Sequence, residues 1–268
     1  MSYILAVYRK NRTTIKRAYP WSIMLGWYFE GTCSILFPIL IYSFMFEGKL
    51  GGQFETFAQT TNYITYVTLG VICALLSTTI LFNVSRGAIT EVREGTLDAF
   101  LISPCPRIPY FIGVFFEQLT RSLITIVPVL ILGAIWGARV PLETLPASLL
   151  VLILLLLANF ALATSISTLM LFTRDTYIVQ NTIFVAMNLV CGVVFPLGYL
   201  PLPIQYFAQI FPLTPALELM RAVILRGEPL GDNWILAVQL LVSSIAYFTI
   251  GIYTFKRMEK RLVEKILA

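Results

Sequence analysis

The stretch "EVREGTLDAFLISPCPRIPYF", residues Glu91–Phe111, places a charged segment between two long apolar parts of the chain. Its first eight residues carry three acidic side chains and one basic one, and Pro104, Pro106 and Pro109 follow. Because proline disrupts a helix interior but suits the first helical turn, these prolines predict the end of one helix and the start of the next. The stretch therefore divides the chain into spans before and after it.

The composition predicts a membrane protein. Of 268 residues, 58% are hydrophobic and 12% are charged, with a mean hydropathy of +0.82. Soluble domains carry about 25% charged residues. The net charge of +5 is read first as a topology signal, because basic residues mark cytoplasmic segments. It does not predict a nucleic-acid partner, since no basic patch is interleaved with aromatic residues on a soluble module.

The fold class predicted is all-α, a polytopic membrane protein with one domain over residues 1–268. A span needs roughly 20 apolar residues, and six segments qualify: Trp21–Phe46, Tyr63–Val84, Ile108–Trp136, Leu145–Phe172, Tyr177–Pro196 and Trp234–Phe255. Lys and Arg gather at the termini and in the second loop, whereas the first, third and fourth loops carry one each and the fifth carries Arg221 and Arg226. This bias predicts that both termini are cytoplasmic.

Residues 1–20 predict an amphipathic helix in the membrane interface. One face carries Tyr3, Ile4, Val7, Tyr8, Ile15, Ala18 and Tyr19, and the other carries Arg9, Lys10, Arg12, Lys16 and Arg17. Such a helix directs its apolar face toward acyl chains and its basic face toward headgroups. Pro20 ends it before the first span.

Residues 86–104 predict a second amphipathic helix, between spans two and three. Its apolar face carries Ile89, Val92, Ala99 and Phe100, and its acidic stripe carries Glu91, Glu94 and Asp98. A helix over Arg86–Leu101 would be about 24 Å long, too short and too charged to span a bilayer. Its polar face could dock a partner or be solvated, and amphipathicity alone favours neither.

Residues 197–228 form a long apolar loop interrupted by prolines. Irregular backbone at membrane depth is tolerated only where it is buried in protein or lines a cavity. We therefore expect two short re-entrant helices here, Pro203–Phe211 and Pro215–Arg226.

Two motifs carry a resemblance to a known family. "EVREGTLDAFLISP" and "FPLGYLPLPIQYFAQIFPLTPALELMRAVILRG" resemble, in the corresponding loops, the ABC type-2 permeases, the membrane subunits of type V ATP-binding-cassette exporters. The order of the elements and the basic N-terminal helix are similar over essentially the whole chain.

The resemblance implies roles for both motifs. Segment 86–104 would be the coupling helix, seated in a groove of a separate ATPase subunit, with the contact set Glu91, Arg93, Glu94, Gly95, Thr96 and Asp98. The re-entrant segment would form an outer gate that includes Pro196, Leu200, Pro201, Pro212 and Pro215. It also implies two ATPases, a second permease copy in a homodimer, and a prokaryotic cytoplasmic membrane.

The chain itself predicts no catalytic function. It has no G-x-x-x-x-G-K-[ST] loop, and its only Gly-Lys pair, Gly48-Lys49, is followed by Leu50. ATP and Mg²⁺ would therefore be bound by the partner. Histidine is absent and the four cysteines form no C-x-x-C pair, so neither a metal site nor another cofactor is predicted.

Polar residues inside the predicted spans are candidates for the transport path. On span two these are Thr78 and Asn83, and on span five they are the amides Asn181 and Asn188, with Phe184 on the same face between them. Such amides either line a cavity or join helices by hydrogen bonds, and both interpretations stay open. Glu117 and Arg121 are spaced as an i, i+4 ion pair on span three; it would be a structural brace or serve substrate or gating.

The predicted function is therefore a permease that exports a compact amphiphile, such as a drug, a peptide antibiotic or a lipid-like molecule, by alternating access. Short outer loops favour this over a lipid-linked glycan or polysaccharide, which is the alternative. A membrane-embedded lipid-modifying enzyme is a distant alternative, because the acidic cluster lacks the D-x-x-D spacing that would hold Mg²⁺. A channel would need no coupling helix.

Overall fold

The computed structural model describes residues 3–18, 21–48, 52–96, 106–173 and 176–267. Within these ranges the chain is helical and contains no strand. The predicted all-α membrane fold is therefore confirmed.

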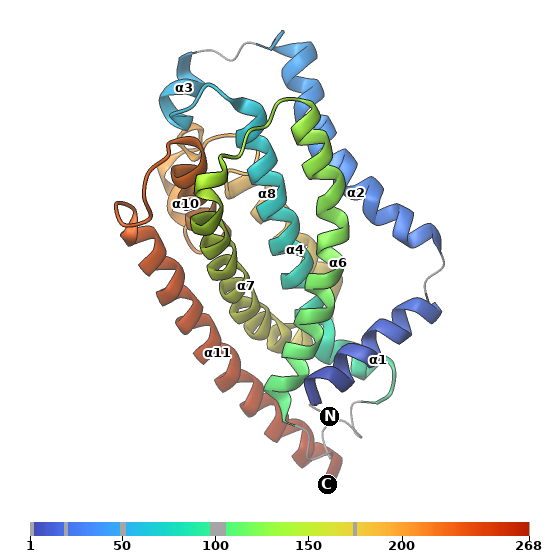
Figure 1. The fold of residues 1–268 in the computed structure, drawn as a ribbon. Coiled ribbons are helices and arrows are strands. Elements are labelled where there is room, and N and C mark those ends of the chain that lie inside the picture. Colours follow the sequence, from blue (N-terminus) through green and yellow to red (C-terminus); the bar gives the residue numbers. More distant parts are fainter. Residues whose placement is uncertain (1–2, 19–20, 49–51, 97–105, 174–175, 268) are drawn as a thin grey trace.

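Five of the described helices are long and apolar enough to cross a membrane. They are α2 (Trp21–Leu40), α4 (Tyr63–Arg93), α6 (Arg107–Ile135), α7 (Leu145–Thr173) and α11 (Trp234–Leu267). They lie side by side in the order α11, α7, α4, α6, α2 (Figure 1). A short π-helix, Ile41–Met45, extends α2. Helices α4 and α7 form the middle of the bundle, where Asn159 donates to the Ser77 hydroxyl across a 2.9 Å hydrogen bond.

Helix α4 is longer than predicted. We expected a span ending at Val84 and a separate helix over Arg86–Leu101, but α4 continues without a break to Arg93. No proline interrupts this stretch, and Gly87 remains helical with the Tyr110 ring packed against it. The second half of the predicted coupling helix, residues 97–104 with Asp98, lies outside the described residues.

Helix α8 (Thr176–Val190) is shorter than the predicted span Tyr177–Pro196. Its 15 residues reach about 22 Å, less than the roughly 30 Å of a hydrocarbon core. It ends early because Gly192 adopts a left-handed backbone, φ +73°, a conformation that terminates helices. The chain continues beyond α8 as the irregular segment 191–196, whose residues Cys191–Val193 are buried in protein.

The proline-rich loop contains the two short helices predicted there, α9 (Leu202–Ala208) and α10 (Leu213–Leu225), bent by 92° relative to each other. Helix α10 is buried over most of its length against α4, α7 and α11. It lies at the same end of the molecule as α3 (Gly52–Ala58) and the start of α11 (Figure 1). We call this the α10 end.

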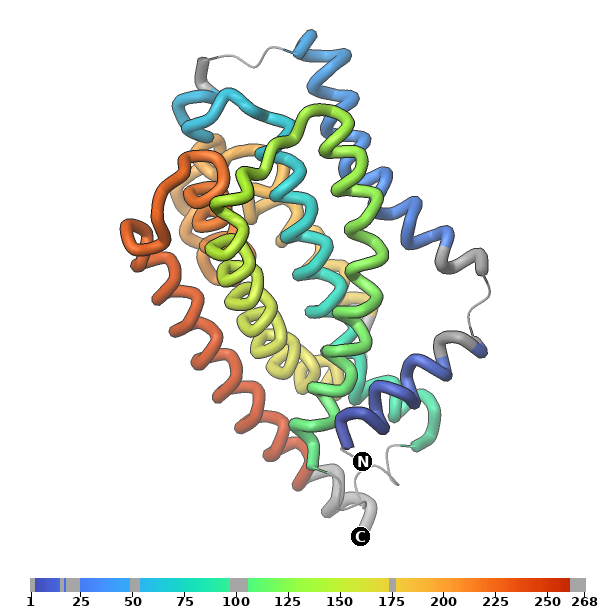
Figure 2. The backbone as a smooth tube through the Cα atoms, viewed as in Figure 1, coloured from blue at the N-terminus to red at the C-terminus, as the bar shows by residue number. Residues whose placement is uncertain are grey.

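Helix α1 (Tyr3–Ala18) lies at the opposite end, which we call the α1 end, against the start of α6 (Figure 2). It packs on α6 where Gly113 leaves room for Val7, and Val7 is buried. Arg9, Lys10 and Arg12 on the same helix are exposed. The predicted separation of an apolar and a basic face is therefore present in these side chains.

Candidate functional site

The end of α4 is a tightly bonded turn. Gly95 has φ +69°, its N–H donates to the Val92 carbonyl at 3.2 Å, and the Thr96 N–H donates to the Glu91 carbonyl at 2.9 Å. This pair of bonds is the Schellman motif, which requires a left-handed residue after the helix. The glycine of the EVREGTLDAFLISP motif is therefore required by the end of this helix, because glycine adopts the left-handed conformation without a steric penalty.

Glu91 joins three elements around this turn. Its carboxylate accepts from Lys10 Nζ of α1 at 2.8 Å, from Tyr110 OH of α6 at 3.0 Å, and from Thr96 Oγ1 at 2.5 Å. Tyr110 OH also lies 3.0 Å from the Gly87 carbonyl of α4. Charge-assisted hydrogen bonds are the stronger class, so the turn is held firmly to α1, α4 and α6.

The position of Glu91 corrects one expectation. The helical pattern placed it on an exposed acidic stripe, but its relative exposure is 5%. Its partners Lys10 and Tyr110 come from helices distant in sequence, and local periodicity carries no information about them. Glu91 therefore stabilises the turn from its buried side through these hydrogen bonds, and little of its surface is available to a partner.

The surface at the α1 end is formed by the residues that follow Glu91. Val92, Arg93, Glu94, Gly95 and Thr96 are all exposed. We call Arg93–Thr96 the α4 turn. The Arg93 guanidinium lies 5.5 Å from the centre of the Tyr177 ring at the start of α8, so the turn also contacts α8.

The residues predicted as an outer gate cluster at the α10 end. Three prolines precede helices as N-caps: Pro196 before the 3-10 turn Leu197–Tyr199, Pro201 before α9, and Pro212 before α10. Pro215 is buried in the first turn of α10, and the Leu200 carbonyl accepts from Gln205 at 2.7 Å. Thr214 donates to the Ala208 carbonyl at 2.7 Å, which joins α10 to the end of α9.

Arg221 on α10 is a buried residue whose role the sequence analysis missed. Its two terminal nitrogens donate to the carbonyls of Gly192 and Val193 at 2.8 and 2.9 Å. Its guanidinium lies over the Tyr66 ring of α4, 3.5 Å from the centroid. Gly70 makes the arrangement possible, because a Cβ there would collide with the Val193 carbonyl. In the sequence, the only indication of a role for Arg221 was its position after the Pro-Leu-Thr-Pro run.

The family model for the ABC-2 type transporter matches residues 22–225. The chain belongs to the ABC-2 type transporter family. A search of curated proteins found no match to the sequence. The matched range ends at Leu225, the last residue of α10, and so covers the α4 turn and both short helices. The protein is therefore the membrane permease component of an ABC transporter, and this family generally works with a separate ATPase subunit.

In this ABC-2 type transporter, α4 and α8 meet through residues of which only Phe184 was predicted for the transport path. Gln180 accepts from Arg86 and donates to the Phe82 carbonyl at 3.2 Å. The rings of Phe82 and Phe184 lie 6.2 Å apart. Sequence reasoning did not select Gln180 or Arg86, although two polar residues on neighbouring apolar helices were a usable signal.

The predicted path residues of the permease fall into three groups. Thr78 is buried and donates to the Ala74 carbonyl at 2.8 Å, so it is turned into the protein. Asn181 and Phe184 are exposed on α8. The remaining amides bind the carbonyl one turn earlier on their own helix, Asn83 to Thr79 at 2.7 Å and Asn188 to Phe184 at 2.9 Å.

The predicted pair on α6 has additional neighbours. The Arg121 guanidinium lies 4.1 Å from the centre of the Trp27 ring on α2, and buried Glu117 accepts from Gln118 at 2.5 Å. Of these two contacts, the one between Arg121 and Trp27 joins α6 to α2. Among the described residues, no group of three or more His, Cys, Asp or Glu side chains is placed to hold a metal ion.

Proposed function

We propose that this permease exports a compact amphiphilic substrate by alternating access, driven by ATP and Mg²⁺ bound in a separate ATPase. Two copies of the chain would pair with two ATPases, in a prokaryotic cytoplasmic membrane with both termini on the cytoplasmic side. The ATPase would contact the α4 turn, including Glu94 and Arg93, together with the segment that follows it.

One observation carries this proposal: α4 is a single helix that joins the α4 turn to the α10 end. Near one end of α4, the buried Glu91 binds Tyr110 next to the α4 turn. Near the other end, the ring of Tyr66 packs against the guanidinium of Arg221. Glu91 and Tyr66 are 25 positions apart on α4, or about 37 Å at 1.5 Å per residue. Because an unbroken helix moves nearly as one body, a displacement of the turn would reach the segment that Arg221 holds.

The exposed face of α8 is consistent with an amphiphilic substrate. Asn181 and Phe184 place an amide and a ring on the same exposed surface. Amides in a membrane protein face protein or water in preference to acyl chains, so this face would border the second permease copy or the substrate path between the copies.

The test is reconstitution of the complete complex. The chain is co-expressed with the ATPase encoded beside it, placed in lipid nanodiscs, and assayed for subunit stoichiometry and vanadate-sensitive ATP hydrolysis. Inside-out vesicles then report direction, because an exporter accumulates substrate inside them when ATP is added outside.

Two variants make the test specific. Glu94→Ala removes an acidic side chain from the α4 turn, and Glu143→Ala removes an exposed one from the loop between α6 and α7. We expect Glu94→Ala alone to weaken ATPase binding. Equal effects of both variants would remove the docking role from the α4 turn, and ATP-dependent efflux from inside-out vesicles would reverse the proposed direction.

A further inference from the structure

A cavity opens at the α1 end between the first turn of α6 and the second half of α11, with α7 behind it. Its volume is about 230 Å³. Its lining includes four aromatic residues, Phe111, Phe160, Phe248 and Phe255. None of the residues predicted for the transport path or the gate lines it, so it is separate from the proposed path.

The walls of the cavity are well packed. The rings of Phe111 and Phe255 meet edge to face at 5.4 Å. Ser165 of α7 donates to the Tyr247 carbonyl of α11 at 2.7 Å, and Gly251 lets α11 approach Thr164 closely. Small residues at helix contacts allow such close approach in membranes. Beyond this contact the two helices leave the aromatic space open.

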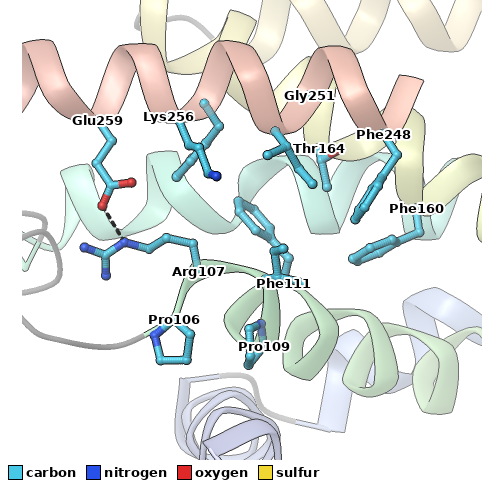
Figure 3. A pocket seen from close by; sticks show the side chains of 13 residues that line it. Pro106, Arg107, Pro109, Phe111, Phe160, Thr164, Phe248, Gly251, Lys256 and Glu259 are labelled. Carbon is cyan, nitrogen blue, oxygen red and sulfur yellow. Dashed lines mark hydrogen bonds and ion pairs between the residues drawn. The ribbon is translucent and has the colours of Figure 1, made fainter. Parts of the chain in front are cut away.

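The mouth of the cavity is charged. Arg107 Nε lies 2.7 Å from Glu259 Oε1, and Lys256 extends over the same end (Figure 3). Figure 3 also shows Phe160 and Phe248 at the opposite end. Eight positions on α11 separate Lys256 from Phe248, which is about 12 Å along the helix. The cavity therefore passes over this length to an apolar interior from a charged mouth, where Arg107 is paired with Glu259 and Lys256 adds a further positive charge.

Helix α1 shows the depth of the mouth in the membrane. Val7 of α1 packs against Gly113, six positions after Arg107 on α6. An amphipathic helix with exposed basic residues lies at the level of the lipid headgroups. The mouth is thus within about 9 Å of that level along α6, and the end of the cavity with Phe160 and Phe248 lies deeper, toward acyl chains (Figure 3).

We infer that this cavity binds one acyl chain of an anionic phospholipid from the leaflet at the α1 end, with the phosphate against Lys256 and Arg107. Basic residues beside the bilayer attract anionic headgroups. The volume of about 230 Å³ is below the roughly 300–1,000 Å³ of sites for drug-sized ligands, so the cavity would hold part of a single acyl chain. Such a lipid would bridge α6 and α11 directly after the proposed coupling segment.

The experiment counts lipids on the purified full-length permease by native mass spectrometry, with dioleoyl phosphatidylglycerol and dioleoyl phosphatidylcholine added in parallel. Lys256→Glu reverses charge at the mouth, and Ile252→Trp fills the cavity wall. The matched controls are Arg257→Glu and Ile250→Trp, which lie on the other side of α11 and line a different groove. We expect Lys256→Glu to lower phosphatidylglycerol retention about fivefold or more.

Support for the site requires that Ile252→Trp also lowers retention and that both controls leave it unchanged. Equal retention of the two phospholipids, or unchanged retention in Ile252→Trp, would overturn the proposal. If the protein retained a soluble anionic amphiphile such as dodecyl phosphate but not phosphatidylglycerol, the ligand would not be a bilayer lipid, and the proposal would be overturned. The readout does not require transport or ATP hydrolysis, so it is independent of the proposed function.

Discussion

The guanidinium of Arg221 lies over the ring of Tyr66, with its carbon 3.5 Å from the ring centroid. This contact joins α10 to α4 at the α10 end, and the same guanidinium binds the carbonyls of Gly192 and Val193. One buried side chain therefore holds three parts of the chain together: the middle span, the short buried helix and the irregular segment after α8.

Replacing Arg221 with Met tests this contact. The variant keeps an unbranched side chain but leaves two carbonyls without their donors, and hydrogen bonds to charged groups contribute about 1.5–3 kcal/mol each. We expect a clear fall in the thermal stability of the purified permease. Arg226→Met is the control, because Arg226 pairs with Glu228 in a loop. A similar small shift in both variants would remove the stabilising role from Arg221.

Gly70→Ala tests the close approach between α4 and the irregular segment. A Cβ at residue 70 would collide with the Val193 carbonyl, and overpacking typically costs about 1–3 kcal/mol. The variant should unfold at lower temperature and lose transport. Gly26→Ala on α2 serves as the control, since a Cβ there meets nothing within 4 Å. A fully stable, active Gly70→Ala would show that the segment moves away freely.

Glu91→Gln and Glu94→Gln should act differently although both remove one negative charge from the same helix end. Glu91 is buried among Lys10, Tyr110 and Thr96, so its substitution should lower stability by about 1–2 kcal/mol. Glu94 is exposed, so its substitution should leave stability unchanged and weaken ATPase binding. Unfolding curves and ATPase affinity, measured on both variants, separate the two roles. The reverse assignment would contradict the geometry.

Gly95→Ala tests the backbone of the α4 turn. A side chain at φ +69° is strained by roughly 1–2 kcal/mol, which would loosen the Schellman motif and reorient the exposed residues. We expect reduced stimulation of ATP hydrolysis by the permease. Gly231→Ala, in the loop before α11, should have no effect, because it has an ordinary φ and open space. Full stimulation by Gly95→Ala would show that the turn tolerates either conformation.

Glu228 predicts a pH dependence in the loop between α10 and α11. Hydrogen bonds from Arg226 and then Asn233 lower its pKa below the ordinary value of 4.5. A carboxyl group whose pKa is lowered on folding stabilises the folded state at pH values above its ordinary pKa. This stabilisation disappears as the pH falls through the lowered pKa. Glu228→Gln should therefore be slightly less stable than the native protein at pH 7, and this difference should disappear once the pH is below the lowered pKa of Glu228. A difference that persists at low pH would point to packing as the cause.

The sequence alone determined the features that depend on local chemistry. Apolar runs of sufficient length predicted the membrane spans, because a bilayer requires about 20 apolar residues for a helical crossing. The prolines at 201, 203, 212 and 215 predicted the two short helices, because proline suits a first turn and disrupts an interior. The family motifs were also readable, since they are strings of residues in order.

Only the tertiary structure decided the features that depend on neighbours distant in sequence. Tyr110 of α6 packs against α4 where this helix continues past Val84. The buried Glu91 also depends on Tyr110, and on Lys10 of α1. The position of Arg221 depends on an irregular segment 28 and 29 residues earlier. Periodicity reports which residues share a face of one helix, but burial and pairing depend on which other helix covers that face, and that is decided by packing of the whole bundle.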